Sequence, residues 1–301
     1  MKLKNIIMRL LLGLIVVMII FSCSTRNSIV DKDKLLGNDY RLFQGTPVWN
    51  LAKAVEDENI SEIKRIVKED KIDIDFKESK FGNTLLMLTI INEQFNSCET
   101  LLELGASPKI HNNASGSSAI IYAAGVNSTS GDNVEFLKLI LMHGGDPNDL
   151  EVGARKTGNT SRNTPLIMAC GNTNKIVSPI EKVKILIEFG ADINYKNEYG
   201  TTALKMAYMQ AHLDVVLYLL KKGADFNEPI YNRDEKDIFL WDDLREQTYP
   251  LDSKQYKYKM EIVEFLKQKG IDYRKLPIPE FIIEDVKETY PDNWREYLDK
   301  Y

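Results

Sequence analysis

Residues Gly200–Asn227 have the sequence GTTALKMAYMQAHLDVVLYLLKKGADFN, and this stretch carries the signals of two short helices joined by a turn. Thr202 is placed to cap the first helix, and a second helix is expected after Ala211 and His212, because apolar residues recur at helical spacing on both sides of that dipeptide. Gly223 follows the last apolar turn, where glycine adopts a left-handed conformation without steric cost. The stretch therefore predicts a helix pair that ends in a glycine turn.

The same pattern of two apolar helical segments and a closing glycine recurs along the chain, and it resembles the ankyrin repeat. The Gly-x-Thr-Pro-Leu-His-x-Ala opening of that family is matched from Gly200, with Ala203 for proline and Lys205 for histidine. Its Leu-Leu-x-x-Gly-Ala-Asp-x-Asn close is matched at Leu219–Asn227. The resemblance implies an all-α ankyrin-repeat solenoid of about six helix-turn-helix repeats with a short helical C-terminal cap. The repeats are expected within residues 46–75, 82–106, 116–148, 164–194, 200–227 and 238–270.

The chain is expected to have four parts. Residues 1–22 are a signal peptide, 23–45 a lipidated tether, 46–275 the repeat domain, and 276–301 the cap, which is predicted as two short helices. The tether lacks sustained periodicity and shows local order only near Leu35–Phe43. The terminal repeat that follows the tether is divergent, as terminal repeats usually are.

An acidic residue stands nine positions before the closing glycine in four of the repeats. A carboxylate is favourable near the positive end of the helix dipole, so each of these residues is expected in the first turn of a second helix. The recurrence therefore predicts a structural role and not a catalytic one. The four residues are Glu135, Glu181, Asp214 and Glu261.

The N-terminus resembles a bacterial lipoprotein signal. Three basic residues precede the apolar run Leu10–Phe21, which is short for a membrane span and suited to a secretory signal peptide. Ile20–Cys23 then looks like a lipobox. The resemblance implies cleavage before Cys23, a diacylglycerol thioether on that cysteine and an acyl chain such as palmitate at the new N-terminus. An uncleaved signal anchor is the alternative.

The charge balance bears on partners and location. The chain has 39 Lys and Arg against 44 Asp and Glu, and loss of the signal peptide would remove basic residues only. An acidic mature domain argues against nucleic acid as a partner, since a basic stripe is the usual footprint. Ser24 and Thr25 are not acidic, so the inner-membrane retention signal of some bacterial lipoproteins is absent. The expected location is the outer membrane, facing the periplasm.

No motif for catalysis or metal binding is found. The stretch Gly153–Thr160 comes near a phosphate-binding loop, but Asn159 stands where the lysine would be. The three histidines fall in different repeats, without metal-ligand spacing. Cys98 and Cys170 lie two repeats apart and are expected to be buried and unpaired. We therefore expect no catalytic residue, no metal, no cofactor and no small-molecule substrate.

A partner-binding surface is expected on the hairpin tips and first helices, where variable side chains would recognise a protein. For Tyr199 and Met209, packing between repeats is an equally good interpretation. The insertion Asp149–Arg162 would add a positively charged finger to this surface, the alternative being a solvated loop without a role. The predicted contact residues are Phe81, Asn83, Ser115, Arg155, Lys156, Arg162, Glu198, Tyr199, Met209 and Gln210.

Two classes of function remain. The favoured class is a non-catalytic binder, either a membrane-anchored scaffold or accessory factor for envelope proteins or an immunity protein that neutralises a toxic effector in the periplasm. The other class is an enzyme that uses an unrecognised set of carboxylates. An enzyme would turn over a substrate without a partner, whereas a binder would capture one protein.

Overall fold

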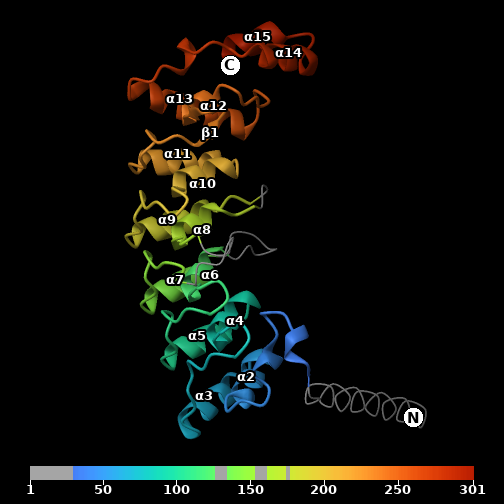
Figure 1. The fold of residues 1–301 in the computed structure, drawn as a ribbon, viewed down its shortest axis with the longest axis vertical. Coiled ribbons are helices and arrows are strands. Elements are labelled where there is room, and N and C mark those ends of the chain that lie inside the picture. The colour runs from blue at the N-terminus through green and yellow to red at the C-terminus, as the bar shows by residue number, and fades with distance from the viewer. Residues whose placement is uncertain (1–29, 126–133, 153–160, 174–176) are drawn as a thin grey trace, which may run out of the picture. The chain divides into compact units, whose positions relative to one another are not determined.

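The computed structural model describes residues 30–125, 134–152, 161–173 and 177–301. In these residues the secondary structure is helical apart from one two-stranded hairpin. The chain divides between Ala114 and Ser115 into an N-terminal unit and a C-terminal unit, and within each unit the helices stack in pairs (Figure 1). None of the described helices has the length and apolar character needed to cross a membrane.

The N-terminal unit holds two helix pairs behind a short irregular segment. Thr84 caps the first helix of the second pair by accepting a hydrogen bond from the Met87 amide, and Asn59 caps its own helix through the Glu62 amide. The elements are the 3-10 helices η1 (Lys32–Lys34) and η2 (Tyr40–Phe43) and the helices α2 (Trp49–Glu56), α3 (Ile60–Glu69), α4 (Leu85–Ile91) and α5 (Phe95–Glu103).

The irregular segment before α2 belongs to the packed core. Tyr40, Leu42 and Phe43 are buried, and η2 packs on α2. These side chains cover apolar surface of the first helix pair. The folded unit thus includes residues that the sequence assigned to the tether.

The C-terminal unit holds four helix pairs and a helical cap. The first helices of neighbouring pairs pack on one another, α6 on α8 and α8 on α10, while α11 packs between α9 and α13. The elements are α6 (Ala119–Gly125), α7 (Glu135–Met142), α8 (Pro165–Cys170), α9 (Ile180–Glu188), α10 (Ala203–Met209), α11 (Leu213–Lys221), β1 (Tyr231–Arg233), β2 (Lys236–Ile238), α12 (Leu240–Leu244), α13 (Lys254–Gln268), the 3-10 helix η3 (Tyr273–Lys275), α14 (Glu280–Thr289) and α15 (Trp294–Lys300).

The helix pair expected from Gly200–Asn227 is confirmed as α10 and α11. The Thr202 hydroxyl accepts a hydrogen bond of 3.2 Å from the Lys205 amide. Gly223 ends α11 with a φ of 95°, in the left-handed region that favours glycine. The apolar positions of α11 are buried, which fixes the register of the fifth pair.

The closing turns of successive pairs are linked by asparagine side chains. Asn148 donates to the Gly190 carbonyl at 2.9 Å and accepts from the Asp192 amide at 2.7 Å. Asn194 makes the same two bonds one pair later, to the Gly223 carbonyl at 3.5 Å and from the Asp225 amide at 2.8 Å. Each asparagine thus satisfies backbone groups left open at the end of the next second helix.

The acidic residues before the closing glycines follow the prediction in three of four repeats. Glu135, Glu181 and Asp214 lie in the first turns of α7, α9 and α11. For Glu261 the prediction was wrong, because α13 begins at Lys254, after the Ser253 cap. Glu261 lies in the middle of that helix, with its carboxylate 3.3 Å from the Lys221 Nζ.

The β1–β2 hairpin lies in a connection where the sequence predicted no strand. Tyr231 pairs with Ile238 in antiparallel register, and Asp234 and Glu235 at the turn have φ values of 51° and 63°. Two consecutive positive φ values are typical of the tight turns that join hairpin strands. The usual glycine is absent from this turn, which explains why the sequence pattern did not indicate it.

The predicted C-terminal cap is confirmed as α14 and α15. Ile282, Val286, Tyr297 and Tyr301 form an apolar cluster of their own. The predicted unpaired state of the two internal cysteines is also confirmed, since Cys98 and Cys170 are buried free thiols. Burial raises the pKa of the Cys98 thiol to about 12, so neither redox nor nucleophilic chemistry is favoured there.

Two basic side chains are buried between the sixth helix pair and the cap. Lys259 is 1% exposed, with its Nζ 3.8 Å from the centre of the Tyr301 ring and 2.7 Å from the Gln247 carbonyl oxygen to which it donates. The Arg245 guanidinium lies 4.6 Å from the Tyr273 ring centre. Burial, with a smaller effect from Arg245, lowers the pKa of Lys259 to about 6.

Candidate functional site

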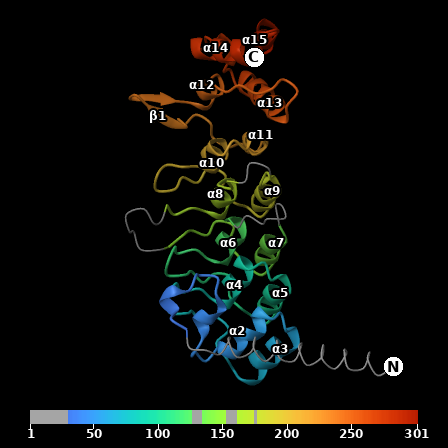
Figure 2. The same cartoon turned by 90° about the vertical axis from the view of Figure 1, so that its right-hand side faces the viewer.

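The first helices of the C-terminal unit lie on one side of it, away from α7, α9 and α11 (Figure 2). The β1–β2 hairpin and the loop before α10 project from this side. We call it the first-helix side. It carries Arg162, Glu198, Tyr199, Met209 and Gln210, which the sequence predicted as contact residues.

Tyr199 and Met209 are strongly exposed on the first-helix side. Tyr199 is 69% exposed and Met209 is 63% exposed, so neither fills a gap between repeats. The loop that presents Tyr199 is held by the Asn197 carboxamide, whose oxygen accepts from the amides of Tyr199 at 3.0 Å and Thr201 at 2.8 Å. The tyrosine therefore projects from a braced loop, which lowers the entropy cost of a contact made through it.

Arg162 and Glu198 are brought together from two successive loops. The Arg162 Nε lies 2.9 Å from a Glu198 carboxylate oxygen, and its Nη1 donates to the Glu151 carbonyl at 3.2 Å. The Glu198 amide in turn donates to the Ser161 carbonyl at 3.2 Å. Arg162 has a φ of 53°, and these bonds stabilise that conformation. The pair joins the base of the Asp149–Arg162 insertion to the Tyr199 loop.

Asn83 and Phe81 lie in the N-terminal unit and have structural contacts. Asn83 is only 2% exposed; its side chain donates to the Gly37 carbonyl at 3.0 Å and accepts from Asn112 at 3.0 Å. A carboxamide buried in this way is not available to a partner, which corrects the expectation for Asn83. Phe81 is half-buried under the Lys80 ammonium, whose Nζ lies 4.7 Å from the ring centre.

Of the remaining predicted site residues, two are half-buried and three lie outside the described part of the chain. Ser115 is half-buried, and its hydroxyl donates to the Ser117 hydroxyl at 2.8 Å. Gln210 is half-buried at the C-terminal end of α10, where its backbone N–H donates to the Met206 carbonyl. Three predicted residues lie outside the described part of the chain: Cys23, Arg155 and Lys156.

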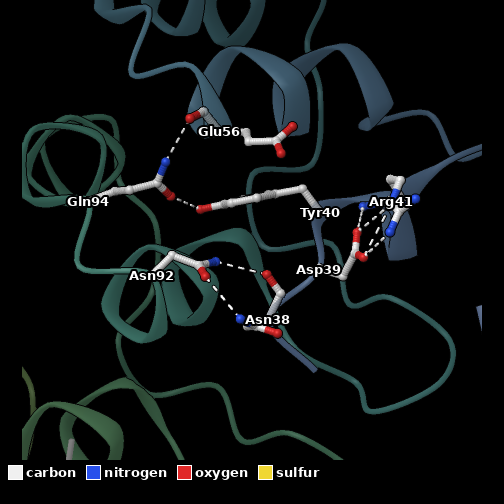
Figure 3. Close-up of a pocket in the computed structure, with 7 residues that line it drawn as sticks. All are labelled: Asn38, Asp39, Tyr40, Arg41, Glu56, Asn92 and Gln94. Atoms are coloured by element: carbon white, nitrogen blue, oxygen red, sulfur yellow. Dashed lines mark hydrogen bonds and ion pairs between the residues drawn. The ribbon is translucent and has the colours of Figure 1, made fainter. Parts of the chain in front are cut away.

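A polar hollow of about 500 Å³ lies in the N-terminal unit (Figure 3). Its side chains bond to one another: the Arg41 guanidinium contacts Asp39 at 2.6 Å, and Gln94 accepts from the Tyr40 hydroxyl and donates to the Glu56 carbonyl at 2.7 Å. The guanidinium lowers the pKa of the Asp39 carboxyl. These bonds fasten the N-terminal segment to the turn between α4 and α5, so we regard the hollow as structural. Its walls are Asn38, Asp39, Tyr40, Arg41, Glu56, Asn92 and Gln94.

A smaller hollow of about 200 Å³ lies beside Met209, between α10, the hairpin and α12. The Asp243 carboxylate in its wall is 7% exposed and accepts hydrogen bonds from the hydroxyls of Tyr208 and Tyr231 and, at 3.1 Å, from Gln247. The sequence did not indicate this site, because its residues come from separate segments. They are Tyr208, Met209, Ala211, Leu213, Ile230, Tyr231, Asp243, Gln247 and Tyr249.

Within the described residues, no three His, Cys, Asp or Glu side chains gather closely enough to hold a metal ion. His212 is buried, and its Nε2 lies 2.7 Å from the Asn172 carbonyl oxygen. Since a carbonyl only accepts, the imidazole donates this bond from a protonated Nε2. His212 therefore ties the fourth pair to the fifth, as expected for a structural histidine.

The sequence model of ankyrin repeats, in three copies, matches residues 128–230. These residues are ankyrin repeats. They include α8, α10 and the Tyr199 loop of the first-helix side. The fold class expected from the sequence, an all-α ankyrin-repeat solenoid with a helical cap, is confirmed.

Several proteins with ankyrin repeats are similar to parts of this chain. The human Notch-regulated ankyrin repeat-containing protein is 49% identical over 44 residues, which are 15% of this chain and 39% of the relative. Human protein phosphatase 1 regulatory subunit 27 is 41% identical over 46 residues, 15% of this chain and 30% of the relative. The matched segments thus span well under half of these relatives. The crystal structure of the ankyrin repeat protein EF0377 covers 73% of this chain and 98% of its own, with a TM-score of 0.49 and 23% identity.

Ankyrin repeats bind other proteins and are typically non-catalytic. The exposed Tyr199 and Met209 are of the residue types that are enriched in the cores of protein interfaces. The ankyrin repeats of this chain are therefore a protein-binding module.

Proposed function

We propose that this chain is a non-catalytic, lipid-anchored binder in the bacterial envelope, which acts as a scaffold or accessory factor for another envelope protein. We infer the binding site from the exposure of Tyr199 and Met209 on the first-helix side. Aromatic and methionine side chains are enriched in the cores of protein interfaces, where polar groups form the rim. The Arg162–Glu198 pair supplies such polar groups next to Tyr199.

The partner on this proposal is a protein. The net charge of −5 disfavours nucleic acid. One similar protein is named as a regulatory subunit of a phosphatase, and a chain that acts only through what it binds would have a comparable role. If the captured partner is a toxin whose lethality the chain suppresses, the immunity role replaces the scaffold role on the same surface.

The double substitution Tyr199→Ala with Met209→Ala is expected to weaken partner binding by at least about tenfold, since central aromatic anchors contribute most of the affinity of an interface. The partner is first identified by a photo-crosslinking amino acid at position 199 in cells, followed by mass spectrometry. Its affinity is then measured by surface plasmon resonance. Thermal stability should change little, because both side chains are exposed.

The matched control is Phe189→Ala with Met142→Ala, an aromatic and a methionine that are exposed at the ends of second helices. Affinity should be unchanged in this control. Loss of binding in the control, with binding intact in the Tyr199 and Met209 variant, would move the contact surface to the second-helix side.

The anchor part of the proposal is supported by the lipobox resemblance at Cys23. Cys23→Ser is expected to leave the protein unlabelled by a palmitate analogue, and either soluble or uncleaved, while the repeats fold normally. Membrane fractionation of cells expressing both forms measures this. Density-gradient separation of the wild-type membranes tests the outer-membrane location. Membrane retention with an N-terminus that is still processed before residue 23 would contradict the lipoprotein assignment.

A further inference from the structure

The hollow beside Met209 contains a buried carboxylate that takes part in none of the ion pairs found among the described residues. Arg233 of the hairpin is engaged with the Glu246 carboxylate through contacts of 2.6 and 2.8 Å. Asp243 accepts three hydrogen bonds, from Tyr208, Tyr231 and Gln247, whereas two carboxylate oxygens offer about four acceptor sites. One acceptor position therefore remains for a donor that enters the hollow.

The tyrosines around this carboxylate keep their protons. The pKa of Tyr208 is raised mainly by burial and secondly by the charge of Asp243. The pKa of Tyr231 is raised to about 12, mainly by burial and secondly by the hydrogen bond to Asp243. Both hydroxyls thus act as donors to Asp243 over the whole physiological pH range. The protein thus surrounds the Asp243 carboxylate with neutral donors, and Arg233 acts on it only at longer range, without an ion pair.

The other walls of the hollow suit a cation on an apolar stem. Tyr208, Tyr231 and Tyr249 line it together with Met209 and Ile230. Aromatic rings attract a cation held over their faces, and the attraction is stronger where water is excluded. The volume of about 200 Å³ is below the roughly 300–1,000 Å³ typical of small-molecule sites, so it fits the end of one side chain.

We propose that this hollow receives a lysine or arginine side chain of the partner protein, held by Asp243 and the tyrosine faces. The inference rests on the proposed function, since it assigns the partner to the same side of the C-terminal unit. Met209 belongs both to the exposed apolar surface and to the wall of the hollow, so one partner segment can engage both. A basic segment would also complement the acidic charge of the chain.

The test uses three short peptides, acetyl-Gly-Lys-Gly-amide, acetyl-Gly-Arg-Gly-amide and the neutral acetyl-Gly-norleucine-Gly-amide, with protein labelled at methionine methyl groups and tyrosine rings. The basic peptides should cause saturable NMR shifts at Met209, Tyr208, Tyr231 and Tyr249 that weaken as salt is raised. The norleucine peptide should cause none.

Two variants locate the effect. Tyr249→Leu removes an aromatic face and leaves the three hydrogen bonds to Asp243 in place, and it should weaken binding of the basic peptides about tenfold. Asp243→Asn should abolish it; a thermal melt verifies that this variant is folded. Phe189→Leu, at an exposed aromatic residue outside the hollow and outside the first-helix side, should bind the peptides as the wild type does.

Equal shifts with the norleucine peptide would make the hollow a merely apolar recess and overturn the proposal. Absence of shifts at these residues with both basic peptides, or unchanged binding in Tyr249→Leu, would also overturn it. These outcomes leave the proposed function intact if the Tyr199 crosslink still captures a partner. Peptide binding without a captured partner would instead remove the proposed function and keep the cation site.

Discussion

Leu219→Ala is expected to lower the free energy of unfolding by about 2–5 kcal/mol, the range for truncating a fully buried leucine. Leu219 is completely buried in α11, which packs against α10 within its own pair and against α9 and α13 on either side. Chemical denaturation monitored by circular dichroism measures the change. Leu36→Ala is the matched control, because Leu36 is 74% exposed and its truncation should change stability by less than about 0.5 kcal/mol.

The location of the damage is a second readout of the same variant. Repeats are stabilised by contacts with their nearest neighbours, so the loss should be concentrated in the fifth and sixth pairs. Amide hydrogen exchange should accelerate in residues 200–270 and change least in α6 and α7. Unchanged protection across 200–270 would contradict the packing of α11 described above.

Lys259→Met is expected to raise the free energy of unfolding by about 1–4 kcal/mol at neutral pH, because the buried lysine must give up its proton on folding and an apolar side chain of similar length avoids that cost. Lys259 is fully buried, and the nearby Arg245 guanidinium further disfavours its charged form. Lys257→Met, at an exposed position of the same helix, is the control and should have little effect.

The stabilisation by Lys259→Met should shrink as the pH rises. The pKa of Lys259 is about 6 in the folded protein and 10.5 for an ordinary lysine, so between these values the unfolded chain binds a proton that the folded chain does not. Wild-type stability relative to the variant therefore increases with pH, by about 1.4 kcal/mol per pH unit within that window. Denaturation of both proteins at two pH values between 7 and 9 measures the slope. An equal difference at both would show that Lys259 titrates alike in the folded and unfolded chains.

The helix pairs could be predicted from the sequence because their signals are local. Thr202 caps α10 and Gly223 ends α11, and each of these signals involves residues within one turn of its position. The burial of Tyr40 and Phe43 could not be predicted in this way, since their packing depends on apolar surface supplied by α2 and its neighbours. The hairpin was missed because Asp234 and Glu235 adopt positive φ values without glycine.

The candidate site was only partly predictable for a related reason. Position within the repeat placed Tyr199 and Met209 at a tip and at a helix end, but only the folded structure distinguishes exposure from packing. The same positional argument failed for Asn83, because its buried side chain is hydrogen-bonded to the carbonyl of Gly37, a residue far away in sequence. Asp243 could not be picked out from the sequence, because the tyrosines that donate hydrogen bonds to its carboxylate come from other segments.

The asparagine links between closing turns have a consequence for how this chain tolerates changes in length. Asn148 and Asn194 each join the end of one second helix to the end of the next, because their side chains bond to backbone groups of the following closing turn. Nothing in that linkage depends on how many residues connect the two helices within a pair or the pair to the next first helix. Insertions at those connections can therefore accumulate without breaking these links, which makes the loops the part of the molecule that is freest to diversify.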